Sequence, residues 1–200
     1  MLLRIKDFFL KIGVDQAVFY TVLSRIVQAG GGVVSIIFIA RYLSKVEQGY
    51  YYTFGSILAI QIFFELGLTG IIVQYVAHEK ASLNWRDNVS LIGDEKSLSR
   101  LSSLLRFCVK WFVVISGILF LGLIVAGFYF FNSYGMHEET LEWRIPWLIL
   151  AFTTATNLTI SPILAFMEGL GKIKEVAQIR LFQQIVQILG LFSFLMMGAK

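Results

Sequence analysis

Apolar residues gather along the chain into five long runs that are separated by polar links. The runs cover residues 18–40, 50–76, 107–131, 145–166 and 176–197. Each run is long enough to cross a hydrocarbon layer of about 30 Å as an α-helix, which rises about 1.5 Å per residue. The pattern therefore predicts an all-α protein, in which residues 1–200 form a single polytopic bundle of five transmembrane helices.

Lys and Arg residues in the links set the predicted orientation, because they accumulate on the cytoplasmic side of a membrane. Twelve of them lie at the N-terminus, between the second and third spans or at the start of the third, and around the link between the fourth and fifth spans. Three lie in the other two links, before the final Lys200. The N-terminus and the link 77–106 are therefore predicted to be cytoplasmic, and the C-terminus is predicted to lie outside.

Two shorter segments have amphipathic patterns. Residues 1–11 mix apolar and basic residues, and we expect them to lie at the membrane surface before the first span. In the link 77–106, leucines recur at helical spacing among Ser and Arg residues, at Leu98, Leu101, Leu104 and Leu105. This spacing predicts an interfacial helix that leads into the third span.

Four of the five spans carry polar residues at helical spacing, whereas the third does not. The sets are Arg25, Gln28, Gly32 and Ser35; Gln61, Glu65 and Thr69; Thr153 or Thr154 with Asn157 and Ser161; and Arg180, Gln183, Gln184 and Gln187. An ionisable residue inside a membrane costs about 2.5 to 3.5 kcal/mol on insertion scales, so it usually serves a function. These sets predict a water-filled cavity, and the alternative is that they only hydrogen-bond one helix to the next.

The charges of the first two spans are placed symmetrically about their link. Arg25 and Glu65 are each twenty residues from Lys45. In an ideal helical hairpin folded at Lys45, the two charges lie at the same depth, where they could face each other. Arg25 and Glu65 are therefore predicted to form a pair within the membrane.

The same reasoning applies to the last two spans. When these are folded about the link at residue 171, Asn157 reaches the same depth as Gln184 and Gln187, near the middle of the membrane. The sequence Ala-Gly-Gly-Gly at 29–32 allows close approach of another helix or local bending, and Pro162 is a second place to bend. Bendable helices around a polar cavity are typical of alternating-access transporters.

The composition agrees with an integral membrane protein: 57% of the residues are hydrophobic and 15% are charged. The net charge of +4 comes from residues concentrated in the links, so it does not indicate nucleic-acid binding. The one cysteine, Cys108, excludes an intramolecular disulfide and multi-cysteine metal or redox motifs. The His and Glu residues of the link 132–144 lack metal-site spacing, and residues 169–172 lack P-loop spacing. We therefore expect no catalytic residue, metal or cofactor, and no enzymatic activity.

Four short motifs of the chain are distinctive: Ser24-Arg25, the link Ala-Arg-Tyr-Leu-Ser-Lys-Val-Glu-Gln-Gly-Tyr-Tyr at 40–51, Phe-Glu-Leu-Gly-Leu at 64–68 and Glu-Gly-Leu-Gly-Lys at 168–172. Together they resemble the N-terminal region of bacterial polysaccharide flippases, the O-antigen and exopolysaccharide exporters of the multidrug/oligosaccharidyl-lipid/polysaccharide exporter superfamily. The resemblance implies a two-lobed fold of twelve or fourteen helices around a cationic cavity. Five spans do not complete one six-helix lobe, so the chain corresponds to most of the first lobe.

The resemblance also implies a function. Such flippases move undecaprenyl-diphosphate-linked oligosaccharides across the bacterial inner membrane, from the cytoplasmic to the outer leaflet. The implied partners are the lipid-linked oligosaccharide, membrane lipids, and polysaccharide polymerase and chain-length proteins.

The candidate substrate-binding residues follow from the chemistry of such a substrate. Arg offers planar, always-charged donors for the oxygens of a lipid diphosphate. Amide side chains suit sugar hydroxyls, and a carboxylate could hold an arginine in place or release it on protonation. The candidates are Arg25 and Arg180 for the diphosphate, Gln28, Gln183, Gln184 and Gln187 for the sugars, Asn157 as a further substrate-binding residue, and Glu65 as the partner of Arg25.

Two alternatives stay open. The first is a cation-coupled multidrug antiporter of the same superfamily, whose cavity should favour acidic groups, whereas the candidates here are two Arg and one Glu. The second is a small, non-transporting membrane subunit for assembly, in which the polar residues only join helices. This alternative predicts that Gln183→Leu and Gln187→Leu chiefly alter oligomerisation.

Overall fold

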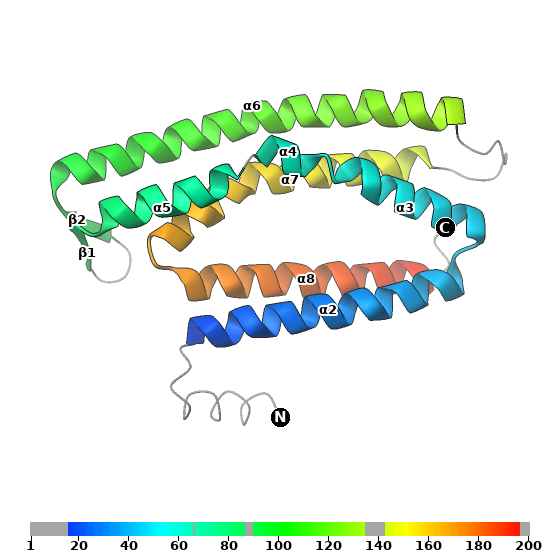
Figure 1. Cartoon of the computed structure of the whole chain (residues 1–200), viewed down its shortest axis with the longest axis horizontal. Helices are drawn as coiled ribbons and strands as arrows, with labels where there is room; N and C mark the ends of the chain where they lie inside the picture. Colours follow the sequence, from blue (N-terminus) through cyan, green and yellow to red (C-terminus); the bar gives the residue numbers. More distant parts are fainter. Residues whose placement is uncertain (1–15, 66, 87–89, 135–142, 197–200) are drawn as a thin grey trace. The chain divides into compact units, whose positions relative to one another are not determined.

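The computed structural model describes residues 16–65, 67–86, 90–134 and 143–196, and nearly all of them are helical (Figure 1). The predicted all-α fold is confirmed. The amphipathic segment 1–11 and residue 197 of the fifth span lie outside the described residues. One feature that the sequence did not predict is a short antiparallel hairpin, in which β1 (Leu83–Arg86) pairs with β2 (Ser90–Gly93).

Four helical segments of the described chain are long and apolar enough to cross a membrane. They are α2 (Gln16–Tyr42), the series from Lys45 to Lys80, α6 (Glu95–Tyr134) and α7 (Arg144–Gly169). The fifth predicted span is the helix α8 (Ile173–Met196), but α8 is not among these four. Its first half carries Lys174, Glu175 and Arg180 together with three Gln residues, and a membrane crossing by α8 stays a prediction.

The second span is interrupted. It consists of α3 (Lys45–Leu58), α4 (Gln61–Glu65) and α5 (Leu68–Lys80). Gly67 has a left-handed conformation with φ of 69°, which an α-helix of L-residues does not accommodate. The prediction that Gln61, Glu65 and Thr69 share one helical face is therefore wrong for Thr69, because the helix ends between Glu65 and Thr69.

The start of α3 is fixed by a capping box in the link between the first two spans. The Ser44 backbone N–H donates to Glu47 Oε2 at 2.6 Å, and the Glu47 backbone N–H donates to Ser44 Oγ at 3.3 Å. Each side chain thus satisfies a backbone donor that the first helical turn leaves without a partner.

The described helices form two compact units, and the first contains α2 and α8. Phe38 stacks on Phe192 with ring centroids 4.3 Å apart, and a Cβ atom at Gly31 would overlap the side chain of Ile188. Residue numbers rise together along the two helices at these contacts, so α2 and α8 run parallel. The glycines at 29–32 thus allow the close approach that the sequence predicted, and Gly31 is the residue that provides it.

The second unit runs from Gly49 to Gly171, and its core lies where α6 and α7 cross. Trp147 is fully buried there, and its Nε1–H donates to the Leu123 carbonyl at 3.2 Å. Gly127 lies against the indole ring, where a Cβ atom would overlap it. Nearer the end of α7, a Cβ atom at Gly169 would be 2.8 Å from the Val73 carbonyl oxygen, so α5 also approaches α7 closely.

The parallel directions of α2 and α8 bear on the topology only if both helices cross a membrane, and the crossing by α8 stays a prediction. In that case the chain between them must cross the membrane an odd number of times. Three candidate spans lie between them: the α3–α4–α5 series, α6 and α7.

Candidate functional site

The first group of candidate residues lies on α2. Arg25 Nη1 donates to Gln28 Oε1 at 3.3 Å, and both side chains are exposed. The neighbouring Ser24 is buried at 7% exposure and faces α8 instead. Arg25 lies nine residues into the helix, or about 14 Å from its start. Helix α2, which is long and apolar enough to cross a membrane, therefore presents an exposed arginine and an exposed amide about 14 Å from its start. Gly32 of the predicted stripe is also exposed, whereas Ser35 is half-buried.

The predicted stripe on α8 is divided between two surroundings. Gln184 is half-buried, and its Oε1 accepts a hydrogen bond from Ser24 Oγ at 3.1 Å. Arg180, Gln183 and Gln187 are exposed. Successive residues of a helix point about 100° apart, so Gln184 faces α2 while Gln183 does not. Gln184 thus joins two helices, as the packing alternative expects, whereas the other three lie on the exposed surface of α8.

Two candidates of the second unit meet at the interruption of the second span. Ser161 Oγ of α7 donates to Glu65 Oε1 at 2.8 Å, and both side chains are half-buried. Glu65 is the last residue of α4, and the next residue after Ser161 is the buried Pro162. The structure therefore brings together a carboxylate and a hydroxyl that are 96 positions apart in the sequence.

The remaining polar residues of α7 point elsewhere. Asn157 is exposed. The Thr153 hydroxyl is also exposed and donates to the Ile149 carbonyl of its own helix at 2.9 Å. For Thr153, the interpretation that the hydroxyl satisfies itself on its own backbone is confirmed.

Two predicted pairings join residues of different units. Arg25 belongs to the first unit and Glu65 to the second. Likewise, Asn157 belongs to the second unit, whereas Gln184 and Gln187 belong to the first. Both pairings stay predictions.

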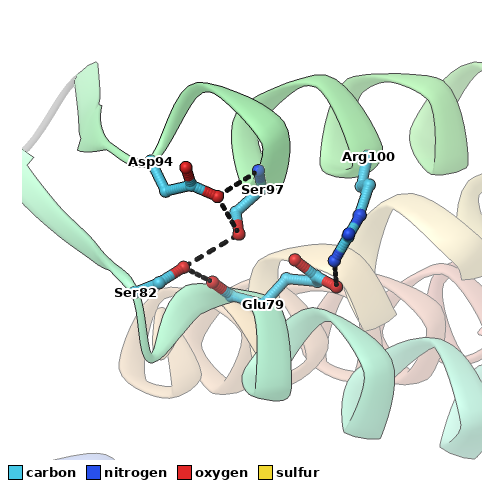
Figure 2. A network of polar contacts seen from close by, with 5 residues as sticks. All are labelled: Glu79, Ser82, Asp94, Ser97 and Arg100. Carbon is cyan, nitrogen blue, oxygen red and sulfur yellow. Dashed lines mark hydrogen bonds and ion pairs between the residues drawn. The ribbon is translucent and has the colours of Figure 1, made fainter.

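A polar network that the sequence analysis missed joins the end of α5 to the start of α6 (Figure 2). Asp94 Oδ2 accepts hydrogen bonds from the Ser97 backbone N–H at 3.0 Å and from Ser97 Oγ at 3.2 Å, which caps α6. Ser82 Oγ lies 2.9 Å from Ser97 Oγ and 2.9 Å from the Glu79 carbonyl oxygen. The network therefore holds the two ends of the β-hairpin segment together.

An ion pair completes this network. Arg100 Nη1 donates to Glu79 Oε1 at 3.2 Å, and the Glu79 side chain is buried at 7% exposure while that of Arg100 is 59% exposed. The start of α6 could have been predicted from the sequence, because Asp94 is a favourable N-cap residue and Glu95 follows it in the first turn. The pairing of Glu79 with Arg100 has no such local signal.

We expect Ser161→Ala to weaken the contact between α4 and α7. Interhelical hydrogen bonds in membranes contribute about 0.6 to 1.7 kcal/mol, and this substitution removes the donor to Glu65. The measurement is the free energy of unfolding of the purified protein in a bilayer mimetic. Thr156→Ala is the control, since the Thr156 hydroxyl bonds only its own helix, to the Phe152 carbonyl at 2.8 Å. Equal losses in the two variants would contradict the expected role of Ser161.

Comparison of the chain with protein-family models, with curated proteins and with solved structures finds no match. Within the described residues, no group of three or more His, Cys, Asp or Glu side chains could hold a metal ion.

Proposed function

We propose that this chain is the N-terminal part of a flippase that moves undecaprenyl-diphosphate-linked oligosaccharide, an O-antigen or exopolysaccharide repeat unit, across the bacterial inner membrane. The observation that carries the proposal is the exposed Arg25–Gln28 pair on a helix long and apolar enough to cross a membrane. An always-charged group in that position is costly unless it meets water or an anion.

The geometry of the pair suits a phosphate ligand. A guanidinium has five N–H donors, and the bond to Gln28 uses one of them. This bond restrains the orientation of Arg25 and leaves donors for the oxygens of a diphosphate. Charge-assisted bonds of this kind are shorter and stronger than neutral ones.

Side chains of α8 extend the proposed site within the unit that also contains α2. Arg180 supplies a second cation, and Gln183 and Gln187 supply exposed amides for sugar hydroxyls. Asn157 of α7 belongs to the other unit, is exposed, and stays a candidate substrate-binding residue. Glu65 accepts a hydrogen bond from Ser161, so in this proposal the position of its side chain is restrained before any substrate binds. Polysaccharide polymerase and chain-length proteins are the proposed partners.

Deletion of the gene in the cells that carry it is expected to remove the surface polysaccharide. Its lipid-linked precursor should accumulate in the inner leaflet, because the sugar cannot cross the membrane without the flippase. The measurements are surface polysaccharide on gels and the amount of extracted lipid-linked precursor, with a plasmid copy of the gene as the control.

Two outcomes distinguish the proposal from its alternatives. Unchanged polysaccharide and precursor, together with increased sensitivity to cationic drugs, would favour the antiporter. Unchanged polysaccharide with loss of a membrane assembly would favour a non-transporting subunit. Either result overturns the flippase proposal.

A further inference from the structure

The helix α6 is much longer than a membrane is thick. It runs without interruption for 40 residues from Glu95 to Tyr134, or about 60 Å, whereas a hydrocarbon core spans about 30 Å. The interfacial helix that the sequence predicted for the link 77–106 is therefore the first part of α6 and not a separate element. Part of α6 must lie outside the hydrocarbon layer.

Aromatic rings mark two levels along α6. Near one end, Phe107 and Trp111 stack with centroids 6.3 Å apart, and both are exposed. Near the other end, Phe131 contacts Tyr50 at 5.4 Å and Trp143 at 5.2 Å. From Trp111 to Phe131 the helix rises about 30 Å, which matches the hydrocarbon thickness. Because Trp and Tyr favour the edges of a bilayer, these two levels place the membrane on α6.

Two cations lie directly beside the first aromatic level. Arg106 and Lys110 are one helical turn apart, both are exposed, and they precede Phe107 and Trp111 by one residue. The opposite face of this turn is packed, since Cys108 and Phe112 are buried at 7% and 1% exposure. The two cations therefore share the outward face of α6 with the two rings.

No acidic side chain of the described residues forms an ion pair with Arg106 or Lys110. Like charges one turn apart on a helix repel each other. Both residues lie within about 8 Å of Trp111 along the helix, which is the depth of the phospholipid headgroups.

We propose that Arg106, Phe107, Lys110 and Trp111 form a binding site for the headgroup of an anionic phospholipid. The lipid phosphate lies between Arg106 and Lys110 and relieves their repulsion, while the two rings contact the glycerol and the first part of the acyl chains. The aromatic pair favours a lipid over free phosphate, because only a lipid has apolar groups for the rings to contact. This site does not depend on the proposed flippase activity.

The same helix offers a matched control. Lys96 is also exposed on α6, but it precedes Trp111 by fifteen residues, or about 22 Å. That distance is well beyond the headgroup layer, so Lys96 should not take part in the site.

The proposal is tested with the full chain in phosphatidylcholine nanodiscs that contain a minor fraction of phosphatidylglycerol. The retained lipids are counted by native mass spectrometry. We expect the wild-type protein to enrich phosphatidylglycerol, and Arg106→Gln with Lys110→Gln to lower the enrichment about 25-fold, about fivefold for each cation. The single variants should each lose about fivefold, which keeps the test valid if the double variant does not fold. Lys96→Gln should behave as the wild type.

Three results would overturn the proposal. The first is a folded double variant that enriches phosphatidylglycerol as the wild type does. The second is an equal loss in Lys96→Gln, which would indicate a general effect of net charge. The third is displacement of phosphatidylglycerol by added inorganic phosphate, which would indicate a site for the free anion.

Discussion

Arg25→Ala is expected to abolish export of the lipid-linked oligosaccharide while leaving the protein in the membrane. Arg25 is exposed on α2, and its hydrogen bond to Gln28 stays within one helix. The contact of α2 with α8 is made instead by Ser24, Gly31 and Phe38, which the substitution leaves unchanged. The variant therefore tests function without removing a packing residue.

The expected loss is large because a diphosphate takes several charge-assisted bonds from one guanidinium. Each such bond contributes about 1.5 to 3 kcal/mol, so the loss of two corresponds to a decrease in export of about 100-fold or more. The measurement is surface polysaccharide and precursor accumulation in cells that express the variant at the wild-type level. Arg25→Lys keeps the charge but not the planar fork, so we expect it to restore export only in part.

Arg41→Ala is the matched control for this prediction. Arg41 is an exposed arginine in the last turn of the same helix, so it lies far from the proposed phosphate site. Cells that express the Arg41→Ala variant should export the oligosaccharide normally. Normal surface polysaccharide in the Arg25→Ala strain, with the protein present in the membrane, would contradict the proposed role of Arg25.

Gly127→Ala is expected to have the largest effect on stability. A single added methyl group at position 127 would overlap the indole ring of Trp147. The ring has little freedom to move, because it is fully buried, donates to the Leu123 carbonyl and contacts Phe54 at 5.2 Å. Overpacking of this kind typically costs about 1 to 3 kcal/mol, so α6 and α7 should separate or unfold at lower temperature.

Two companion variants make this measurement specific. Gly122→Ala adds the same methyl group to the same helix where nothing lies within 4 Å, so it should leave the unfolding temperature nearly unchanged. Trp147→Leu makes space at the crossing, so the double variant with Gly127→Ala should lose less stability than the sum of the two single losses. Additive losses in this double-mutant cycle would show that overlap with the Trp147 ring is not the cause of the loss in Gly127→Ala.

The sequence was sufficient to predict the helices but not the interruption of the second span. An apolar run of about twenty residues predicts a helix strongly, because its backbone groups can find partners only within it. A single glycine inside such a run is compatible with a continuous helix. Glycine adopts positive and negative φ about equally, so the residue type alone does not select the left-handed conformation that Gly67 has. The four-residue strands of the hairpin are similarly too short to give a clear alternation.

The candidate site shows the same limit. Helical spacing correctly placed Arg25 and Gln28 on one side of α2, where they form a hydrogen bond. It could not show that Ser24 and Gln184 turn toward a neighbouring helix, because periodicity relates residues within a helix and does not identify the helix beside it. For the same reason, Ser161 could not be identified as the partner of Glu65.

Because α6 is one continuous helix, its first part moves together with the rest of the helix when the helix tilts. From Phe107 back to Glu95 the helix extends about 18 Å, and the bond from Arg100 to Glu79 ties this extension to the end of α5. A change in tilt of about 20°, within the range that transmembrane helices show, would swing the first turn sideways by about 6 Å. The β-hairpin, whose ends are held by the network around Ser97, would be carried along. A spectroscopic label on this hairpin would therefore move by several ångströms when the tilt of α6 changes, and this movement would make the change in tilt measurable.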